Sequence, residues 1–219
     1  MVINAKSGVE VGTELLWEYV EDFKTPTLFV VNQVDHEKSD FDAAVEQATA
    51  RFGNKVLPIQ YPLNQGTGFN TIVDALRMTM YVFPPEGGKP EKQEIPASEK
   101  DRVLAMHNAI VEAAAENDEE LMERYFEHGT LSEEELAYGL RVAIGKRAVF
   151  PLFCVSAINN MGSGRIMGFI NDVCPAPNQR SAAPLVGGGE LECNPDDDTT
   201  IFIFKTHNEP RVGNISYFK

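Results

Sequence analysis

The sequence predicts an α/β fold: a short parallel sheet, a region of strands and helices between two of its strands, and the first strands of a further β-domain. Three observations support this prediction. Residues 1–35 read as strand, helix, strand and polar loop, which is the βαβ pattern of a parallel sheet. A second continuous apolar run, at 148–155, also ends in a polar loop, and 199–219 shows the alternation of two strands.

The elements of the parallel sheet follow in order along the chain. A first short strand begins at Val2, and a helix follows it, with apolar residues at helical spacing at Val11, Leu15, Leu16 and Tyr19. The run 27–31 is apolar throughout, which is typical of a strand buried on both faces. A short helix over 42–52 ends at Gly53. After the strand at 148–155 comes a helix that directs Ile166, Ile170 and Val173 inward.

The region between the apolar runs 27–31 and 148–155 is predicted to contain further strands and helices. Residues 56–63 read as one strand, and 72–83 alternate as one antiparallel strand with a solvent-exposed face. Three helices then carry start signals, in which a polar residue is followed three positions later by an acidic one: Ser98 with Asp101, Asn117 with Glu120, and Ser132 with Glu135.

The end of the chain differs in composition. Residues 178–198 are rich in Gly, Pro, Ala and Asp and are predicted to form a linker. The segments 200–206 and 212–218 then alternate as two strands. Two strands are marginal on their own, so we expect them to begin a larger β-domain.

The composition excludes several classes of protein. No run of about 18 apolar residues is present, so no membrane span is predicted. Three cysteines, an odd number without metal-site spacing, indicate reduced thiols and a cytoplasmic location. The net charge of −14 argues against direct nucleic-acid binding, because such a chain repels phosphates.

Much of that charge is concentrated in one segment. Between Glu94 and Glu135 there are 13 acidic and three basic residues. The ordinary interpretation is a set of solvated helix faces. The alternative is a docking surface for a basic partner.

Polar loops follow two of the predicted buried strands: Asn32-Gln33-Val34-Asp35 and Ser156-Ala157-Ile158. A carboxylate such as Asp35 can accept hydrogen bonds from the N1–H and 2-amino groups of guanine, and Asn32 can contact the base. A backbone N–H in a Ser-Ala turn can donate to the guanine O6. Such a site rejects adenine because buried polar groups would be left unpaired. The simpler interpretation is that Asn32 and Asp35 only form a turn.

These loops and their surroundings resemble translation elongation factor G over essentially the whole chain. The resemblance rests on the following segments: 8–14, 32–35, 41–42, 51–53, 58–62, 121–125, 131–136, 156–162, 175–177 and 204–206. It implies half of a P-loop-GTPase-like sheet, formed by 1–35 and 149–177 as the C-terminal half of the G domain. It also implies an inserted α+β subdomain at 36–148, a linker at 178–198, and the start of a β-barrel second domain at 199–219.

The resemblance implies that Asn32, Gln33, Asp35, Ser156, Ala157 and Ile158 contact the guanine nucleotide. It implies GTP or GDP and magnesium for the whole protein, with weak or absent nucleotide binding in this part alone. No G-x-x-x-x-G-K-[ST] loop occurs in the sequence, so the chain is expected to begin within a G domain, near its fourth strand. His36, His107, His128 and His207 lie outside any matching motif, and no catalytic or metal-binding residue is predicted.

Two residues depart from the family pattern. Gln33 stands where the N-K-x-D motif has lysine, and Asn4 stands where the family usually has aspartate. Gln33 is shorter and uncharged, so nucleotide affinity should fall. Either the substitution is tolerated in a working GTPase, or the protein is a divergent relative with weak or absent GTPase activity.

The leading hypothesis is a fragment of an elongation-factor-G-like GTPase that acts in ribosomal translocation, with the ribosome and its stalk proteins as partners. The fragment alone is expected to be inactive and to dimerise through an exposed sheet edge. The alternative is a non-hydrolysing ribosome-binding paralogue that docks through the acidic insertion. A ribosomal-protection or release-type relative is a third possibility, against which the helix at 121–125 favours the elongation-factor branch.

Overall fold

A computed structural model describes residues 1–179 and 182–219 of the chain. They form two compact units, Met1–Pro175 and Ala176–Lys219, which are described separately below. Residues 180 and 181, within the predicted linker, lie outside the described residues. In the part that is described, no helix is both long enough and apolar enough to cross a membrane.

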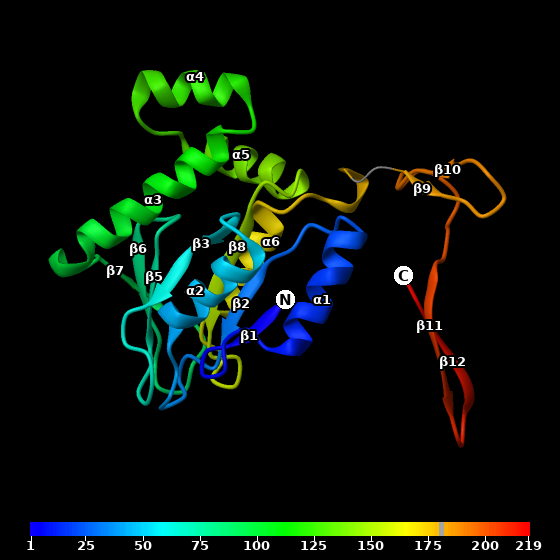
Figure 1. Cartoon of the computed structure of the whole chain (residues 1–219), viewed down its shortest axis with the longest axis horizontal. Coiled ribbons are helices and arrows are strands. Elements are labelled where there is room, and N and C mark those ends of the chain that lie inside the picture. The colour runs from blue at the N-terminus through cyan, green and yellow to red at the C-terminus, as the bar shows by residue number, and fades with distance from the viewer. Residues whose placement is uncertain (180–181) are drawn as a thin grey trace. The chain divides into compact units, whose positions relative to one another are not determined.

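The first unit is built on a four-stranded parallel sheet with the order β1-β2-β8-β3 (Figure 1). Its strands are β1 Val2–Asn4, β2 Phe29–Asn32, β3 Val56–Pro58 and β8 Phe150–Val155. The helices of this part are α1 Val11–Asp22, α2 Phe41–Phe52 and α6 Ser163–Asp172. The predicted α/β class and parallel sheet are confirmed.

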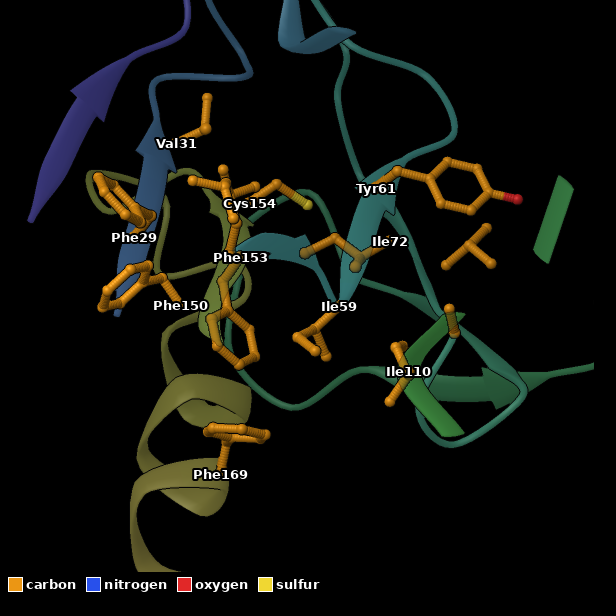
Figure 2. Close-up of a cluster of buried hydrophobic side chains, with 14 of the residues drawn as sticks. Phe29, Val31, Ile59, Tyr61, Ile72, Ile110, Phe150, Phe153, Cys154 and Phe169 are labelled. Carbon is orange, nitrogen blue, oxygen red and sulfur yellow. The ribbon is translucent and has the colours of Figure 1, made fainter. Parts of the chain in front are cut away.

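Aromatic side chains attach the helices to opposite faces of this sheet. On one face, Trp17 of α1 and Phe52 of α2 pack against Phe29 and Phe150. On the other face, Phe169 of α6 packs edge-on against Phe153, with ring centroids 4.9 Å apart (Figure 2). These are buried, close-packed contacts, so they fix the strand ends that carry the polar loops.

The predicted inward face of α6 is confirmed for two of its three residues. Val173 is buried and Ile166 packs partly buried against the core, whereas Ile170 is 44% exposed and the buried Phe169 was not predicted. In α1, the residues whose spacing predicted the helix, Val11, Leu15, Leu16 and Tyr19, are exposed, and Trp17 packs on the sheet. Helical spacing therefore identified both helices, but in α1 it did not identify the residue that packs on the sheet.

Between β3 and β8 the chain forms a further region of strands and helices, called the inserted region below. It begins with a four-stranded antiparallel sheet, β4-β5-β6-β7. Its strands are β4 Gln60–Pro62, β5 Thr71–Asp74, β6 Thr79–Val82 and β7 Glu91–Gln93. A 3₁₀ turn (Ala97–Glu99) leads to α3 Lys100–Ala115, α4 Glu119–His128 and α5 Glu133–Gly145, which Figure 1 shows grouped together in green.

Both strand predictions in this region were wrong in extent. The segment 56–63 is not one strand, because the chain passes from the parallel to the antiparallel sheet at Ile59. The Ile59 N–H donates to Leu152 O in β8, and its carbonyl accepts from Ala75 N–H beyond β5. The segment 72–83 is a hairpin, in which Asp74 Oδ1 accepts the Arg77 N–H and starts the turn.

The helix start signals were predicted with mixed success. Ser132 and Glu135 form the expected reciprocal capping box at the start of α5. The second helix is capped by Asp118 rather than Asn117, and α3 begins without a side-chain cap. Asp118 Oδ1 accepts from the N–H groups of Glu120 and Leu121, which satisfies two helix N–H groups that would otherwise lack partners.

The capping box at α5 makes a prediction about acid stability. The backbone N–H of Ser132 and the guanidinium of Arg124 hold the pKa of Glu135 at about 2, below its ordinary value of 4.5. A lowered folded-state pKa means that this stabilisation is fully present above about pH 4.5 and is lost as the pH falls towards 2. We expect Glu135→Gln to lower the urea midpoint at pH 7 and to have a smaller effect at pH 3. Glu134→Gln, an exposed neighbour, is the control.

The second unit is small and consists of strand pairs. It contains a 3₁₀ turn (Pro177–Gln179) and the two-residue strands β9 Ala183–Pro184 and β10 Glu190–Leu191, which pair within the predicted linker. The antiparallel pair β11 Ile203–Glu209 and β12 Gly213–Phe218 follows. These two strands match the sequence prediction to within a few residues.

Candidate functional site

The parallel sheet brings three strand ends together. Asn4 at the end of β1 is in register with Asn32 at the end of β2, and Asn32 is in register with Val155 at the end of β8. Because the strands are parallel, the segments that follow them leave the same edge of the sheet. This is the edge at which open α/β sheets bind ligands.

Hydrogen bonds join the two polar loops that the sequence singles out. The Ala157 N–H donates to Asn32 Oδ1 at 3.0 Å, and the Asn159 side-chain amide donates to Asp35 Oδ2 at 3.2 Å. Residues 32–35 and 156–159, more than 120 positions apart, therefore form one cluster. The Ala157 N–H that was expected to meet a guanine O6 is bonded to Asn32.

Two polar atoms of this cluster have no hydrogen-bond partner among the described residues. They are Asp35 Oδ1 and Ser156 Oγ, and both are buried. A buried oxygen without a partner is costly, so both atoms favour a further polar partner. An acceptor on Asp35 suits the N–H groups of guanine, and the Ser156 hydroxyl, which can donate or accept, suits a neighbouring polar atom.

Gln33 does not point into this cluster. Its backbone is left-handed, with φ of 64°, and its Oε1 accepts a hydrogen bond from Asn4 Nδ2 at 2.7 Å. Asn4 is fixed in turn, because its Oδ1 accepts the Lys6 N–H at 2.9 Å. The two residues that depart from the family pattern are therefore partners of each other.

One predicted residue contributes no side-chain contact, and one contributing residue was missed. The Ile158 side chain is 86% exposed and lies outside the hydrogen-bonded cluster. Asn159, which bonds directly to Asp35, was not predicted. Its signal was its position in the loop after a buried strand, where a side-chain amide can reach a neighbouring carboxylate.

The remaining titratable groups give no second centre in the described ranges. The His36 ring accepts the Lys38 N–H, and the His107 ring bonds to the Ala75 carbonyl. Burial raises the pKa of the Cys154 thiol, and raises that of Cys174 to about 11. No cluster of three or more His, Cys, Asp or Glu that could hold a metal is found within residues 1–179 and 182–219.

A groove of about 770 Å³ lies away from these loops, beside the β5–β6 turn and the start of α5. Its arginine, Arg77, already bonds to Glu133 at 2.7 Å and lies 3.5 Å from Asp172. The charge of this arginine is therefore compensated within the protein. We assign the candidate site to the two loops and not to this groove.

The chain is similar to known proteins both in sequence and in fold. Residues 1–176 match the family described as the elongation factor Tu GTP-binding domain. A crystal structure of a protein from Thermus thermophilus superimposes with a TM-score of 0.81 at 25% identity, and the match covers 99% of this chain and 30% of that protein. The chain thus spans less than a third of the length of that relative. The family match covers most of the chain, so the chain belongs to the translational GTPases that carry the elongation factor Tu GTP-binding domain.

Proposed function

We propose that this chain supplies the guanine-reading half of the nucleotide site in an elongation-factor-G-like GTPase that acts in ribosomal translocation. The observation that carries the proposal is the buried Asp35 Oδ1, which has no partner among the described residues. The loop that contains it, 32–35, is hydrogen-bonded to the second loop, 156–159. The family binds guanine nucleotides, and the cluster lies at the strand ends where its base would be read.

The proposed recognition assigns a role to each group. Asp35 accepts the guanine N1–H and 2-amino group; its Oδ1 has no partner among the described residues, and its Oδ2 also accepts the Asn159 amide. Asn32 braces the second loop through Ala157 and presents its amide to the base. The Ser156 backbone, which exchanges hydrogen bonds with Met161, holds the turn that follows β8. Adenine lacks the N1–H and 2-amino donors, so it would leave Asp35 unpaired.

Phosphate chemistry is not proposed for these residues. The sequence contains no G-x-x-x-x-G-K-[ST] loop to hold the phosphates. We therefore expect these 219 residues to bind guanine nucleotides weakly and not to hydrolyse them. Magnesium and the triphosphate would be held elsewhere in a complete G domain, and no step is assigned to them here.

The test is a titration of this chain with GDP and, separately, with ADP, followed by the backbone amide resonances of residues 32–35 and 156–159. Shifts that saturate with GDP but not with ADP would support the proposal. Equal shifts with both nucleotides, or shifts with neither, would contradict guanine recognition by these loops.

The Asn4–Gln33 hydrogen bond separates the two versions of the proposal, a working GTPase and a non-hydrolysing ribosome-binding paralogue. If the substitution is tolerated, the amide pair keeps the loop in place, and Gln33→Lys alone should lower GDP affinity because Asn4 loses its acceptor. The double variant Asn4→Asp with Gln33→Lys should then restore affinity by ion pairing. A non-additive effect of about 0.5–3 kcal/mol is expected for two residues in contact, measured by isothermal titration.

The paralogue alternative predicts the opposite result. If guanine binding has decayed at Gln33, the unchanged chain binds GDP undetectably, and Gln33→Lys alone gains affinity without any need for Asn4→Asp. Additive effects of the two substitutions would show that the hydrogen bond between them has no influence on the site.

We further propose that the inserted region docks, through its acidic helices, on the basic surface of a ribosomal stalk protein. The exposed acidic side chains of α3 and α4 support this, including Glu112 in α3 and Glu116, which caps the C-terminal end of α3. Reversing both to lysine is expected to weaken binding to isolated stalk protein at least several-fold and to reduce its salt dependence. Unchanged affinity would contradict a role for these two residues.

We propose that an isolated sample of this chain self-associates. The β1 strand lies at the edge of the parallel sheet. Val2, Val11 at the start of α1 and Phe23, which directly follows α1, are exposed. An unpaired edge strand beside an apolar helix face is prone to pairing with a second copy. Light scattering should give a dimer mass; a monomer with low binding of a hydrophobic dye would contradict this. We also propose a cytoplasmic location, in keeping with the proposed role in translation.

A further inference from the structure

The second polar loop, residues 156–161, packs against the inserted region. Ser156 and Met161 exchange backbone hydrogen bonds of 3.0 Å in both directions, which closes the loop 156–161. A Cβ placed on the next residue, Gly162, would lie 3.0 Å from the side chain of Ile72 in β5. The end of the loop therefore packs against the antiparallel sheet as well as against β8, the strand that precedes it.

A second contact comes from the turn after β6, at 84–88. Gly87 is buried in this turn, and a Cβ at Gly87 would lie 1.8 Å from the backbone carbonyl oxygen of Asn159. No side chain fits between two backbones this close. The glycine is therefore required by the approach of the inserted region to the loop.

Asn159 connects this contact to the carboxylate. Its backbone lies against Gly87, and its side-chain amide donates to Asp35 Oδ2 at 3.2 Å. The distance lies at the long end of the usual range for such bonds, so a small displacement of the Asn159 backbone is enough to break it. Asp35 would then lose the contact that fixes its orientation.

We propose that Asn159 is a positioning residue for Asp35, and that the Gly87 turn of the inserted region holds Asn159 in place. The inserted region thereby controls the geometry of guanine recognition without touching the base. The inference rests on the proposed function for its consequence in binding, whereas the contact itself is independent of any ligand. Local sequence does not reveal this link, because Asn159 lies 72 positions after Gly87 and 124 positions after Asp35.

Two adjacent glycines provide a matched test. Gly87→Ala and Gly88→Ala both place a side chain at positive φ, 75° and 99° respectively, so both variants carry similar backbone strain. A Cβ at Gly88 meets no atom within 4 Å. Only Gly87→Ala pushes against Asn159.

The first readout requires no nucleotide. In Gly87→Ala we expect faster hydrogen exchange at the Ser156 and Met161 amides and shifted resonances for the Asn159 side-chain amide and for Asp35. Gly88→Ala should leave these signals as in the unchanged chain. Equal effects of the two variants on these signals would overturn the inference, as would the absence of any effect of Gly87→Ala.

The second readout is the dissociation constant for GDP measured on the same samples. We expect Gly87→Ala and Asn159→Ala to weaken GDP binding roughly tenfold, as for the loss of a hydrogen bond to a charged group, whereas Gly88→Ala leaves it unchanged. Asn159→Ala keeps the loop backbone, so it should lose GDP affinity with little change in Ser156 and Met161 exchange. Full GDP affinity in Asn159→Ala would overturn the positioning role.

The two readouts separate the inference from the proposed function. If the unchanged chain binds no GDP, guanine recognition by this chain fails. The link from Gly87 through Asn159 to Asp35 is then decided by the nucleotide-free signals alone, since these compare Gly87→Ala directly with Gly88→Ala.

Discussion

Replacing Asp35 with asparagine is expected to remove the preference of this chain for guanine and to create one for xanthine. Asp35 offers only acceptors, and its Oδ1 lacks a partner among the described residues. An amide presents one acceptor and two N–H donors, so it opposes the guanine 2-amino group but pairs with the 2-oxo group of xanthine. For guanine, the hydrogen bond from the 2-amino group is replaced by a contact between two donors, and the N1–H bond loses its charged acceptor; together these correspond to roughly 10²–10⁴ in the affinity ratio.

The measurement compares GDP and xanthosine diphosphate in separate titrations of the unchanged and Asp35→Asn chains. Asp40→Asn is the matched control, because Asp40 lies close by and caps α2 through a 2.9 Å bond from the Ala43 N–H. Asparagine caps helices as well as aspartate does, so this variant should retain the guanine preference. An unchanged guanine preference in Asp35→Asn would show that the base is not read at Asp35.

The parts of the site that could be predicted are those with a local signal. Continuous apolar runs identified β2 and β8, and the polar residues directly after them identified Asn32, Asp35 and Ser156. Adjacent parallel strands then place these residues together, as the register of Asn32 with Val155 shows. For these residues the linear order carried enough information, since sheet geometry supplies the rest.

The parts that could not be predicted depend on contacts between distant segments. Gly87 is one of two consecutive glycines in an ordinary turn, and nothing local distinguishes it from Gly88. Only the folded chain shows that Asn159 lies against it. Gln33 and Asn4 were each recognisable as departures from the family pattern, but their hydrogen bond follows from the pairing of β1 with β2.

The hairpin error has a similar origin. Alternation over 72–83 continues through the turn, so a period of two indicates a strand where the chain reverses. The signal for the turn is Asp74, whose carboxylate accepts the Arg77 N–H. The same carboxylate is fully buried and bonds to Arg165 in α6, an interaction that local sequence cannot reveal.

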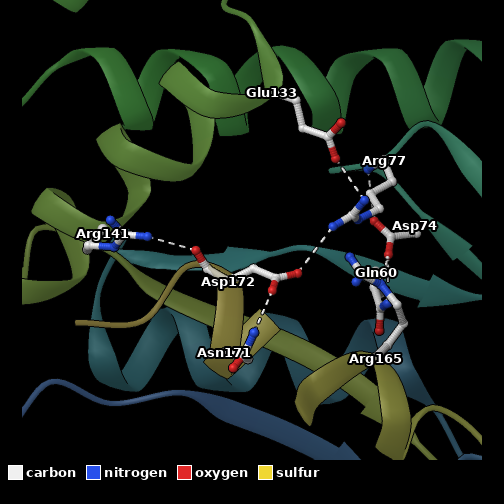
Figure 3. A network of polar contacts seen from close by, with 8 residues as sticks. All are labelled: Gln60, Asp74, Arg77, Glu133, Arg141, Arg165, Asn171 and Asp172. Carbon is white, nitrogen blue, oxygen red and sulfur yellow. Dashed lines mark hydrogen bonds and ion pairs between the residues drawn. The ribbon is translucent and has the colours of Figure 1, made fainter. Parts of the chain in front are cut away.

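That buried carboxylate has the largest expected effect on stability. Asp74 Oδ2 accepts from Arg165 Nε at 2.7 Å and from Gln60 Nε2 at 3.0 Å (Figure 3). Asp74→Ala leaves Arg165, 14% exposed at its side chain, as an uncompensated charge. Removing one partner of a buried pair costs about 3–5 kcal/mol. We expect a correspondingly lower urea midpoint for the first unit.

A second variant distinguishes the contribution of the Asp74–Arg165 pair to stability from the cost of leaving Arg165 as an unpaired charge. Asp74→Leu combined with Arg165→Met removes both charges, and should be more stable than Asp74→Ala because no buried charge is left unpaired. Glu133→Gln, which breaks the exposed pair with Arg77, should change stability by no more than about 1 kcal/mol. If Asp74→Ala destabilised the first unit no more than Glu133→Gln does, the Asp74–Arg165 pair would not contribute to holding the β5–β6 hairpin against α6.

Because α6 directly follows the loop that carries Asn159, loss of this pair should also weaken guanine binding, through the loop and not through any contact with the base.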